Sequence, residues 1–226
     1  MQKVNWNKKL WPPSNWNESN GGQQEFVRAS SLFNMNDPKF VFIHIGKNAG
    51  TSIHRRTLSP LFPQSNNSIA TKEALSSLSF SDFFKFTVIR NPWDRMLSCY
   101  FYFKKHGGFQ YNHETFFDLT DIDFTSFLKE VAWDELGNCT NKHWINQDLM
   151  THDLTSGHCW VDFFIRFENI DNDWLKIKKE LGIDADLPHS NRSRKNTSYK
   201  SYYSNDSKKI VEKIFEKEID LFKFSY

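Results

Sequence analysis

The segment from Phe42 to Ser52, FIHIGKNAGTS, combines residue types that bind anions. The apolar run Lys39–Ile45 indicates a strand buried on both faces, and Thr51 and Ser52 are placed to open a helix after a loop of small residues. Backbone N–H groups at such a helix start converge on one point, and the helix dipole favours an anion there. Lys47 adds a mobile positive charge. The segment therefore predicts a phosphate-binding loop.

The position of the lysine separates this loop from the Walker A loop of ATP-binding proteins. In that motif the lysine directly precedes the Ser or Thr, whereas Lys47 comes four residues before Thr51. Gly46 and Gly50 are expected to allow backbone conformations and close approaches that bulkier residues block. An ordinary turn between a strand and a helix is the alternative interpretation.

A second basic position ends the next predicted strand, Phe86–Arg90. In open α/β sheets, ligands bind beyond the carboxyl ends of the strands. Arg90, with the hydroxyl of Ser98 from the following helix, suits a second phosphate through charge-assisted hydrogen bonds. The alternative for Arg90 is a structural ion pair with Asp94.

Together the two segments resemble the sulfotransferases that use 3′-phosphoadenosine 5′-phosphosulfate (PAPS). The similarity is to the carbohydrate-type group, which includes chondroitin and heparan 2-O-sulfotransferases and small bacterial members. FIHIGKNAGTSI resembles the 5′-phosphosulfate loop F-I-H-I-P-K-T-G-G-T-S, and FTVIRNPWDRMLSCYFYF resembles the 3′-phosphate motif R-N-P-W-D-R-x-x-S-x-Y. Weaker similarity extends from about residue 39 to the end, including His143, Gln147 and the closing residues.

The resemblance implies a role for each matching position. The 5′-phosphosulfate would be held by the loop residues Lys47, Asn48, Ala49, Gly50, Thr51 and Ser52. Arg90 and Ser98 would hold the 3′-phosphate, and Arg192 or Lys195 would close over the nucleotide. Gly46 and Asn48 stand where the family usually has Pro and Thr, and Asn48 is expected still to present a donor. The implied partners are PAPS, its product PAP (adenosine 3′,5′-bisphosphate), and a hydroxyl-bearing acceptor such as a carbohydrate or glycoconjugate.

Sulfuryl transfer needs positioning, positive potential and a base that accepts the proton of the attacking hydroxyl. Lys47 would stabilise the leaving oxygen, so no metal ion is required. Relatives often carry a histidine between the loop and the second strand, but here that stretch, residues 67–73, contains none. Glu73 and His143 are the candidate bases. The alternative interpretation of Glu73 is a solvated residue on a helix, and that of His143 is a histidine packed in the protein.

Strands that alternate with helices predict one α/β domain, with three layers and a P-loop-like, mostly parallel central sheet. This domain is assigned to residues 37–226, and residues 1–36 are interpreted as an irregular arm. A third strand is predicted at Val161–Phe167. Helices are expected from Pro92, over 123–133, over 171–181 before Gly182, and over 205–222.

Composition excludes several classes of function. Lys and Arg number 29 against 27 Asp and Glu, and this near-balance argues against a nucleic-acid-binding protein. The three cysteines form no C-x-x-C pair, so neither a zinc ribbon nor a disulfide framework is expected. No signal peptide or membrane span is recognised, which predicts a cytoplasmic protein. Peripheral contact with a glycolipid acceptor, or origin as a fragment of an anchored protein, stays open.

Two other functions fit parts of the pattern. A kinase of the P-loop type would need Mg²⁺ and ATP, and the lysine position argues against it. A non-catalytic relative would bind the nucleotide or a glycan without turnover, consistent with the missing histidine. The aromatic content of 16% suits sugar stacking, although core packing explains most of it as well. The residues considered for stacking are Tyr100, Tyr102, Trp133, Trp144 and Trp160.

Overall fold

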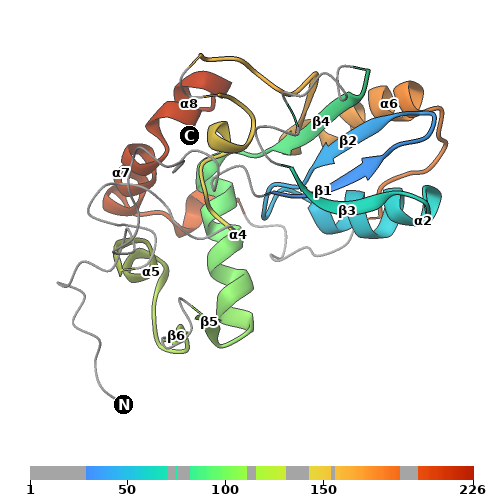
Figure 1. Ribbon diagram of the computed structural model, residues 1–226. Coiled ribbons are helices and arrows are strands. Elements are labelled where there is room, and N and C mark those ends of the chain that lie inside the picture. Colours follow the sequence, from blue (N-terminus) through green and yellow to red (C-terminus); the bar gives the residue numbers. More distant parts are fainter. Residues whose placement is uncertain are drawn as a thin grey trace, which may run out of the picture.

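The computed structural model describes residues 29–70, 75, 82–110, 116–130, 143–153, 156–188 and 198–226. Within these residues the main sheet has five strands in the order β3-β1-β2-β4-β7. The strands are β1 (Ala29–Asn34), β2 (Phe40–Ile43), β3 (Asn66–Ala70), β4 (Phe84–Ile89) and β7 (Phe163–Arg166), and a separate hairpin pairs β5 (Gly108–Gln110) with β6 (Phe116–Asp118). In Figure 1 the sheet lies on one side of the molecule, and α4 (Pro92–Lys105) runs between it and a second group of helices and ends near β5.

The remaining helical segments follow the predicted order. They are η2 (Thr51–Leu58), α2 (Ser59–Leu61), α5 (Phe124–Glu130), η4 (Asp148–Met150), η5 (Phe167–Asn169), α6 (Ile170–Leu181), η6 (Tyr199–Tyr202), α7 (Asn205–Ile214) and α8 (Glu216–Phe222). Gly182 ends α6 in the left-handed conformation, as predicted. The single helix expected over 205–222 is instead two helices, because the chain leaves helical geometry at the buried Phe215.

The prediction of a mostly parallel sheet is confirmed. β4 runs parallel to both β2 and β7, whereas β1 is antiparallel to β2 and to β3. Four of the five strands therefore share one direction, and β1 alone opposes them. Since β2 and β4 are parallel neighbours, their carboxyl ends lie at the same edge of the sheet. This places the predicted phosphate loop next to Arg90.

The predicted arm requires a correction where the structure describes it. Residues 29–34 are not irregular but form β1, which pairs with both β2 and β3. Leu32 and Phe33 are buried on opposite faces of the sheet, so this strand belongs to the core. The residues before 29 lie outside the described part.

Strand β2 is buried on both faces, as its unbroken apolar sequence predicts. Phe40 and Phe42 pack under η2 and α6, together with Ile53 and Trp174. Val41 and Ile43 face the opposite side, where they are covered mainly by apolar residues between 145 and 161. The sheet is therefore sandwiched, and the loop that follows β2 starts from a rigid strand.

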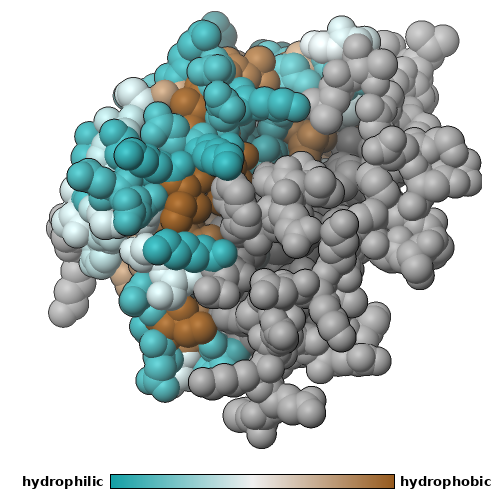
Figure 2. All heavy atoms as spheres, turned by 90° about the vertical axis from the view of Figure 1, so that its left-hand side faces the viewer, coloured by the Kyte–Doolittle hydropathy of each residue, from teal (hydrophilic) through white to brown (hydrophobic). Residues whose placement is uncertain are grey.

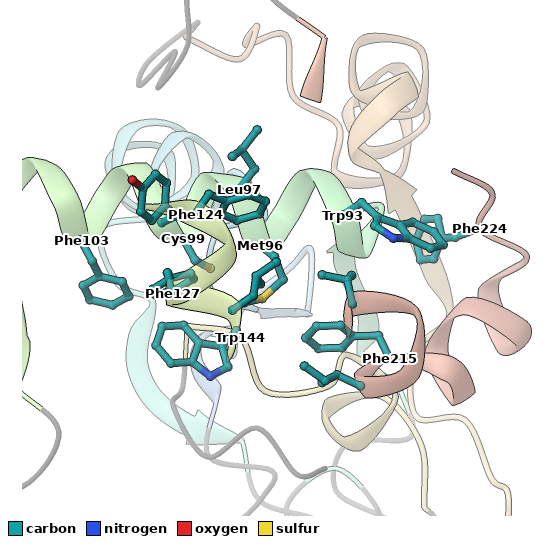
Figure 3. Close-up of a cluster of buried hydrophobic side chains, with 14 of the residues drawn as sticks. Trp93, Met96, Leu97, Cys99, Phe103, Phe124, Phe127, Trp144, Phe215 and Phe224 are labelled. Carbon is teal, nitrogen blue, oxygen red and sulfur yellow. The ribbon is translucent and has the colours of Figure 1, made fainter. Parts of the chain in front are cut away.

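Helix α4 begins as the sequence predicts. The Asn91 side chain accepts a hydrogen bond from the Trp93 N–H, and Pro92 occupies the first helical position. The apolar face of α4 packs against α5, α7 and the chain end in a large buried cluster, labelled in Figure 3: Trp93, Met96, Leu97, Cys99, Phe103, Phe124, Phe127, Trp144, Phe215 and Phe224. This packing fixes the helix that faces both basic segments.

The outer side of the helical group is mostly hydrophilic. Figure 2 shows hydrophilic side chains over most of its coloured surface, with apolar residues confined to narrow strips. No helix among the described residues is long and apolar enough to cross a membrane.

Candidate active site

The loop after β2 holds two non-glycine residues in left-handed backbone conformations. These are Lys47, with φ 66°, and Ala49, with φ 58°. Such conformations cost an L-residue roughly 1–2 kcal/mol, so other contacts must hold them. We expected Gly46 and Gly50 to supply the unusual conformations, yet Gly50 has an ordinary helical φ of −57°.

Gly50 is required for space rather than for its backbone angles. A Cβ atom at this position would overlap the imidazole ring of His44. His44 stacks against Phe42 and lies edge-on to His54, with ring centroids 6.1 and 5.5 Å away. Gly50 therefore makes the close approach expected of a loop glycine, and its neighbour is His44 of the same segment.

The helix start turns backbone donors outward. The first helical bonds are donated by the N–H groups of Ser52 and Ile53, both to the Ala49 carbonyl at 2.9 and 3.1 Å. The N–H groups of residues 49–51 precede these bonds, in the turn whose donors have no helical acceptor. The helix then continues in the wide π form. Within it, Thr57 Oγ1 donates to the Ser52 carbonyl five residues earlier. Such π segments are rare and frequently occur at functional sites.

Two histidines, the partly buried His44 and the buried His54, contact each other next to the loop. His54 Nε2 contacts Asn67 Oδ1, and its Nδ1 lies 3.4 Å from His44 Nδ1. Burial lowers the pKa of His44 to about 4, and burial also lowers the pKa of His54. Both rings are neutral at pH 7. They support the loop without adding charge to it.

Lys47 lies against an aromatic ring of helix α4. Its Nζ is 4.0 Å from the centroid of Tyr102, in cation–π geometry. Tyr102 stacks in turn on His143, with centroids 5.6 Å apart. Burial lowers the pKa of the Lys47 ammonium, and the neighbouring Arg90 also lowers it. The structure thus brings the predicted lysine and one candidate base into contact with the same tyrosine ring.

Arg90 reaches the loop directly. Its Nη1 donates to the Lys47 carbonyl at 2.8 Å. Its Nε and Nη2 both lie 2.7 Å from Asp94 Oδ2, and its guanidinium stacks 4.0 Å from the ring of Phe167. The ion pair considered as the alternative is therefore present. This pair and the bond to the Lys47 carbonyl fix the orientation of the guanidinium beside the loop.

One face of α4 contacts both cations. Asp94, Ser98 and Tyr102 follow one another at intervals of four residues, so they lie on the same side of the helix. Asp94 binds Arg90, Tyr102 contacts Lys47, and Ser98, which is buried, lies between them. Lys47 and Arg90 therefore both contact the face of α4 that carries Ser98.

The expectation for Asn48 is wrong. Its side chain is buried and points away from an anion at the loop: Nδ2 donates to the Val88 carbonyl at 2.7 Å and to Gln147 Oε1 at 2.6 Å. The amide that replaces the usual Thr anchors the loop to the sheet instead of presenting a donor. Gln147, which accepts one of these bonds, was marked in the sequence only by the weaker similarity of residues after the two motifs.

Gln147 is hydrogen-bonded to a buried carboxylate. Glu218 of α8 accepts from the Gln147 backbone N–H at 2.5 Å and from Gln147 Nε2 at 2.9 Å. Burial raises the pKa of Glu218 to about 7, while the charge of Arg95 opposes that rise. No motif in the sequence marked Glu218, because its partners are distant along the chain.

The pKa of Glu218 predicts how stability depends on pH. The folded pKa of about 7 exceeds the ordinary value of 4.5, so the folded protein binds the extra proton between these values. The free energy of unfolding should therefore fall as pH rises from about 4.5 to 7, by at most about 3 kcal/mol from this group. Urea titrations between pH 5 and 8 should show this fall in the wild type. A Glu218→Gln variant with the same pH slope would contradict the assignment.

Some predicted residues lie outside the described part, namely Glu73, Trp133, Arg192 and Lys195. Of the aromatic residues considered for sugar stacking, Tyr100, Trp144 and Trp160 are buried in the core, whereas Tyr102 is 38% exposed. The described cysteines, Cys99 and Cys159, are not disulfide-bonded.

These features define an α/β protein with two basic residues, Lys47 and Arg90, at the carboxyl ends of two adjacent parallel strands. Residues 31–225, most of the chain, match the model of the sulfotransferase family. The chain belongs to this family, and the resemblance of its two motifs is confirmed. Neither a curated protein nor a solved structure matches the chain significantly. The family supports sulfuryl transfer as the general reaction.

Proposed function

We propose that this protein transfers the sulfuryl group of PAPS to a hydroxyl of a carbohydrate or glycoconjugate. The observation that carries the proposal is the contact between the two strand ends, where Arg90 Nη1 donates to the Lys47 carbonyl at 2.8 Å. Two strand ends that are joined in this way, each with a basic side chain, suit a nucleotide with an anionic group at each end of its ribose.

In the proposed reaction, an acceptor oxygen attacks sulfur and the bond between sulfur and the 5′-phosphate oxygen breaks. The new ester keeps the sulfuryl group, and PAP leaves with the bonding electron pair. Lys47 and the N–H groups of residues 49–51 stabilise the charge that develops on the leaving oxygen. Lys47 rests on Tyr102 in this structure, and its partial burial strengthens the interaction of its charge with an anion.

His143 is the candidate base that the geometry favours. It lies beside Tyr102, whose ring also contacts the Lys47 ammonium. Glu73 remains a candidate on sequence grounds. We expect His143→Ala to lower kcat by about 10²- to 10⁴-fold, the contribution typical of a general base. If His143→Ala and Glu73→Gln both keep full activity, neither residue is the base.

An exposed aromatic ring beside the site supports a carbohydrate acceptor. Tyr102 is the one described member of the predicted stacking set that is exposed, and it adjoins Lys47. A sugar ring placed near it would bring a hydroxyl toward the transferred group.

The proposal is tested by following ³⁵S from labelled PAPS into a panel of sugars, glycolipids and small alcohols, with EDTA present. We expect label in one acceptor class, undiminished by EDTA. Tight PAP binding with no transfer to any acceptor would instead indicate a non-catalytic relative. Phosphate transfer from ATP that EDTA abolishes would indicate a kinase.

Replacing Arg90 should weaken binding of the 3′-phosphate more than binding of the 5′-phosphate. Lysine keeps the charge but loses the planar donors, so Arg90→Lys should weaken PAP binding by about ten- to a hundred-fold, the worth of a charge-assisted hydrogen bond. Binding of adenosine 5′-monophosphate, which lacks the 3′-phosphate, should change little. Calorimetry on both nucleotides measures the difference. Equal losses for the two would mean that Arg90 has only a structural role through Asp94.

A further inference from the structure

A buried polar chain connects the C-terminal helix α8 to the anion site. It begins at Glu218, whose two carboxylate oxygens accept from the backbone and the side chain of Gln147 at 2.5 and 2.9 Å. Glu218 and Gln147 are both fully buried. A carboxylate that accepts two N–H donors in this way fixes the position of the residue that donates them.

Gln147 passes this constraint to both basic segments. Its Oε1 accepts from the Arg90 backbone N–H at 2.8 Å and from Asn48 Nδ2 at 2.6 Å. Its Nε2 also donates to the Arg90 carbonyl at 2.9 Å. A single amide therefore binds the end of β4 and the middle of the phosphate loop.

The anchored loop residue stands between two residues in left-handed backbone conformations. Asn48 lies between Lys47 and Ala49, which have φ values of 66° and 58°. Strained conformations persist only where surrounding contacts impose them. The two side-chain bonds of Asn48, to Gln147 and to the Val88 carbonyl, are contacts of this kind.

We propose that Glu218 is a positioning residue which, through Gln147, holds the phosphate loop and Arg90 in the geometry that binds the nucleotide. This inference rests on the proposed function, since it concerns the same nucleotide. A residue of α8, a helix distant along the chain from both motifs, then contributes to nucleotide affinity. Glu218 itself touches neither the nucleotide nor the acceptor.

The ionised form of Glu218 is the one that fits. If either carboxylate oxygen carried a proton, that oxygen would be a weaker acceptor, and its bond to a Gln147 N–H would weaken. Two charged groups face Glu218 from neighbouring elements: Arg95 of α4 favours ionisation, and Asp148 of η4 opposes it. Arg95 also donates through Nε to the Gly46 carbonyl at 3.2 Å, so the counter-charge is itself tied to the loop.

The test is calorimetric titration of the full chain with PAP at pH 8 and at pH 6. Glu218→Gln replaces one acceptor oxygen with an NH₂ group that must face a Gln147 donor. We expect its PAP affinity at pH 8 to be at least tenfold below that of the wild type. Glu216→Gln is the matched control, because it makes the same change at an exposed position of α8 and should leave affinity unchanged.

The dependence on pH distinguishes positioning from a general structural defect. Protonation makes wild-type Glu218 resemble the glutamine variant. The difference in PAP affinity between the wild type and Glu218→Gln should therefore be smaller at pH 6 than at pH 8. A difference that is equal at both pH values, or no difference, overturns the inference. Absence of PAP binding by the wild type would instead overturn the proposed function. If Glu218→Gln does not fold, Gln147→Met tests the same chain, and unchanged affinity in that variant would also overturn the inference.

Discussion

Lys47→Ala is expected to lower the rate of sulfuryl transfer by about 10²- to 10³-fold, the loss typical when one group that stabilises developing charge is removed. The Lys47 ammonium is the cation that the loop places beside the helix start, where the leaving oxygen would lie. The substitution keeps the Lys47 carbonyl that accepts from Arg90. It also keeps an L-residue at the same left-handed backbone position. The fold should therefore survive, with an unfolding midpoint close to that of the wild type.

The rate is measured with labelled PAPS and any acceptor found in the screen. Lys179→Ala, at an exposed position of α6, is the control and should retain full activity. Turnover near the wild-type rate in Lys47→Ala would refute the assignment of the loop as the sulfuryl-transfer site.

Gly50→Ala is expected to destabilise the protein by about 1–3 kcal/mol or more, the range found for overpacked cores. The new methyl group would overlap the His44 ring, and that ring is confined by Phe42 and His54. Relief requires the loop to move, so PAP binding should fall sharply as well. Urea unfolding and calorimetry measure the two effects.

A second substitution tests this cause directly. In the His44→Ala background the space is open, and Gly50 has an ordinary helical φ of −57°. Adding Gly50→Ala there should cost much less than in the wild type, because alanine adopts this φ without strain and no ring occupies the space of its methyl group. A penalty as large as in the wild type would show that the His44 contact is not the reason for glycine at this position.

The parts of the site predicted from the sequence are those that depend on local order along the chain. An apolar strand, a loop of small residues and two hydroxyl residues predicted the loop before Thr51. Asn91 and Pro92 predicted the start of α4, and both occupy the expected cap positions. The parallel pairing of β2 and β4 then brings Lys47 and Arg90 together, as two successive buried strands predict.

What the sequence did not predict depends on contacts between distant residues. Asn48 turns inward because Gln147, which lies 99 residues later, offers an acceptor. Glu218 matters through a residue 71 positions earlier. β1 was assigned to an arm because its sequence, ASSLFN, lacks a continuous apolar run, yet pairing with both β2 and β3 stabilises it. Likewise, only packing explains why Gly50 must be glycine.

The central claim is that the two strand ends bind the two anionic ends of one nucleotide. It is tested most directly by comparing wild-type affinity for PAP with that for adenosine 5′-monophosphate in EDTA. The account predicts that PAP binds at least tenfold more tightly, because only PAP offers a 3′-phosphate to Arg90 and Ser98. Equal affinity for the two nucleotides, or no binding of PAP, would contradict it.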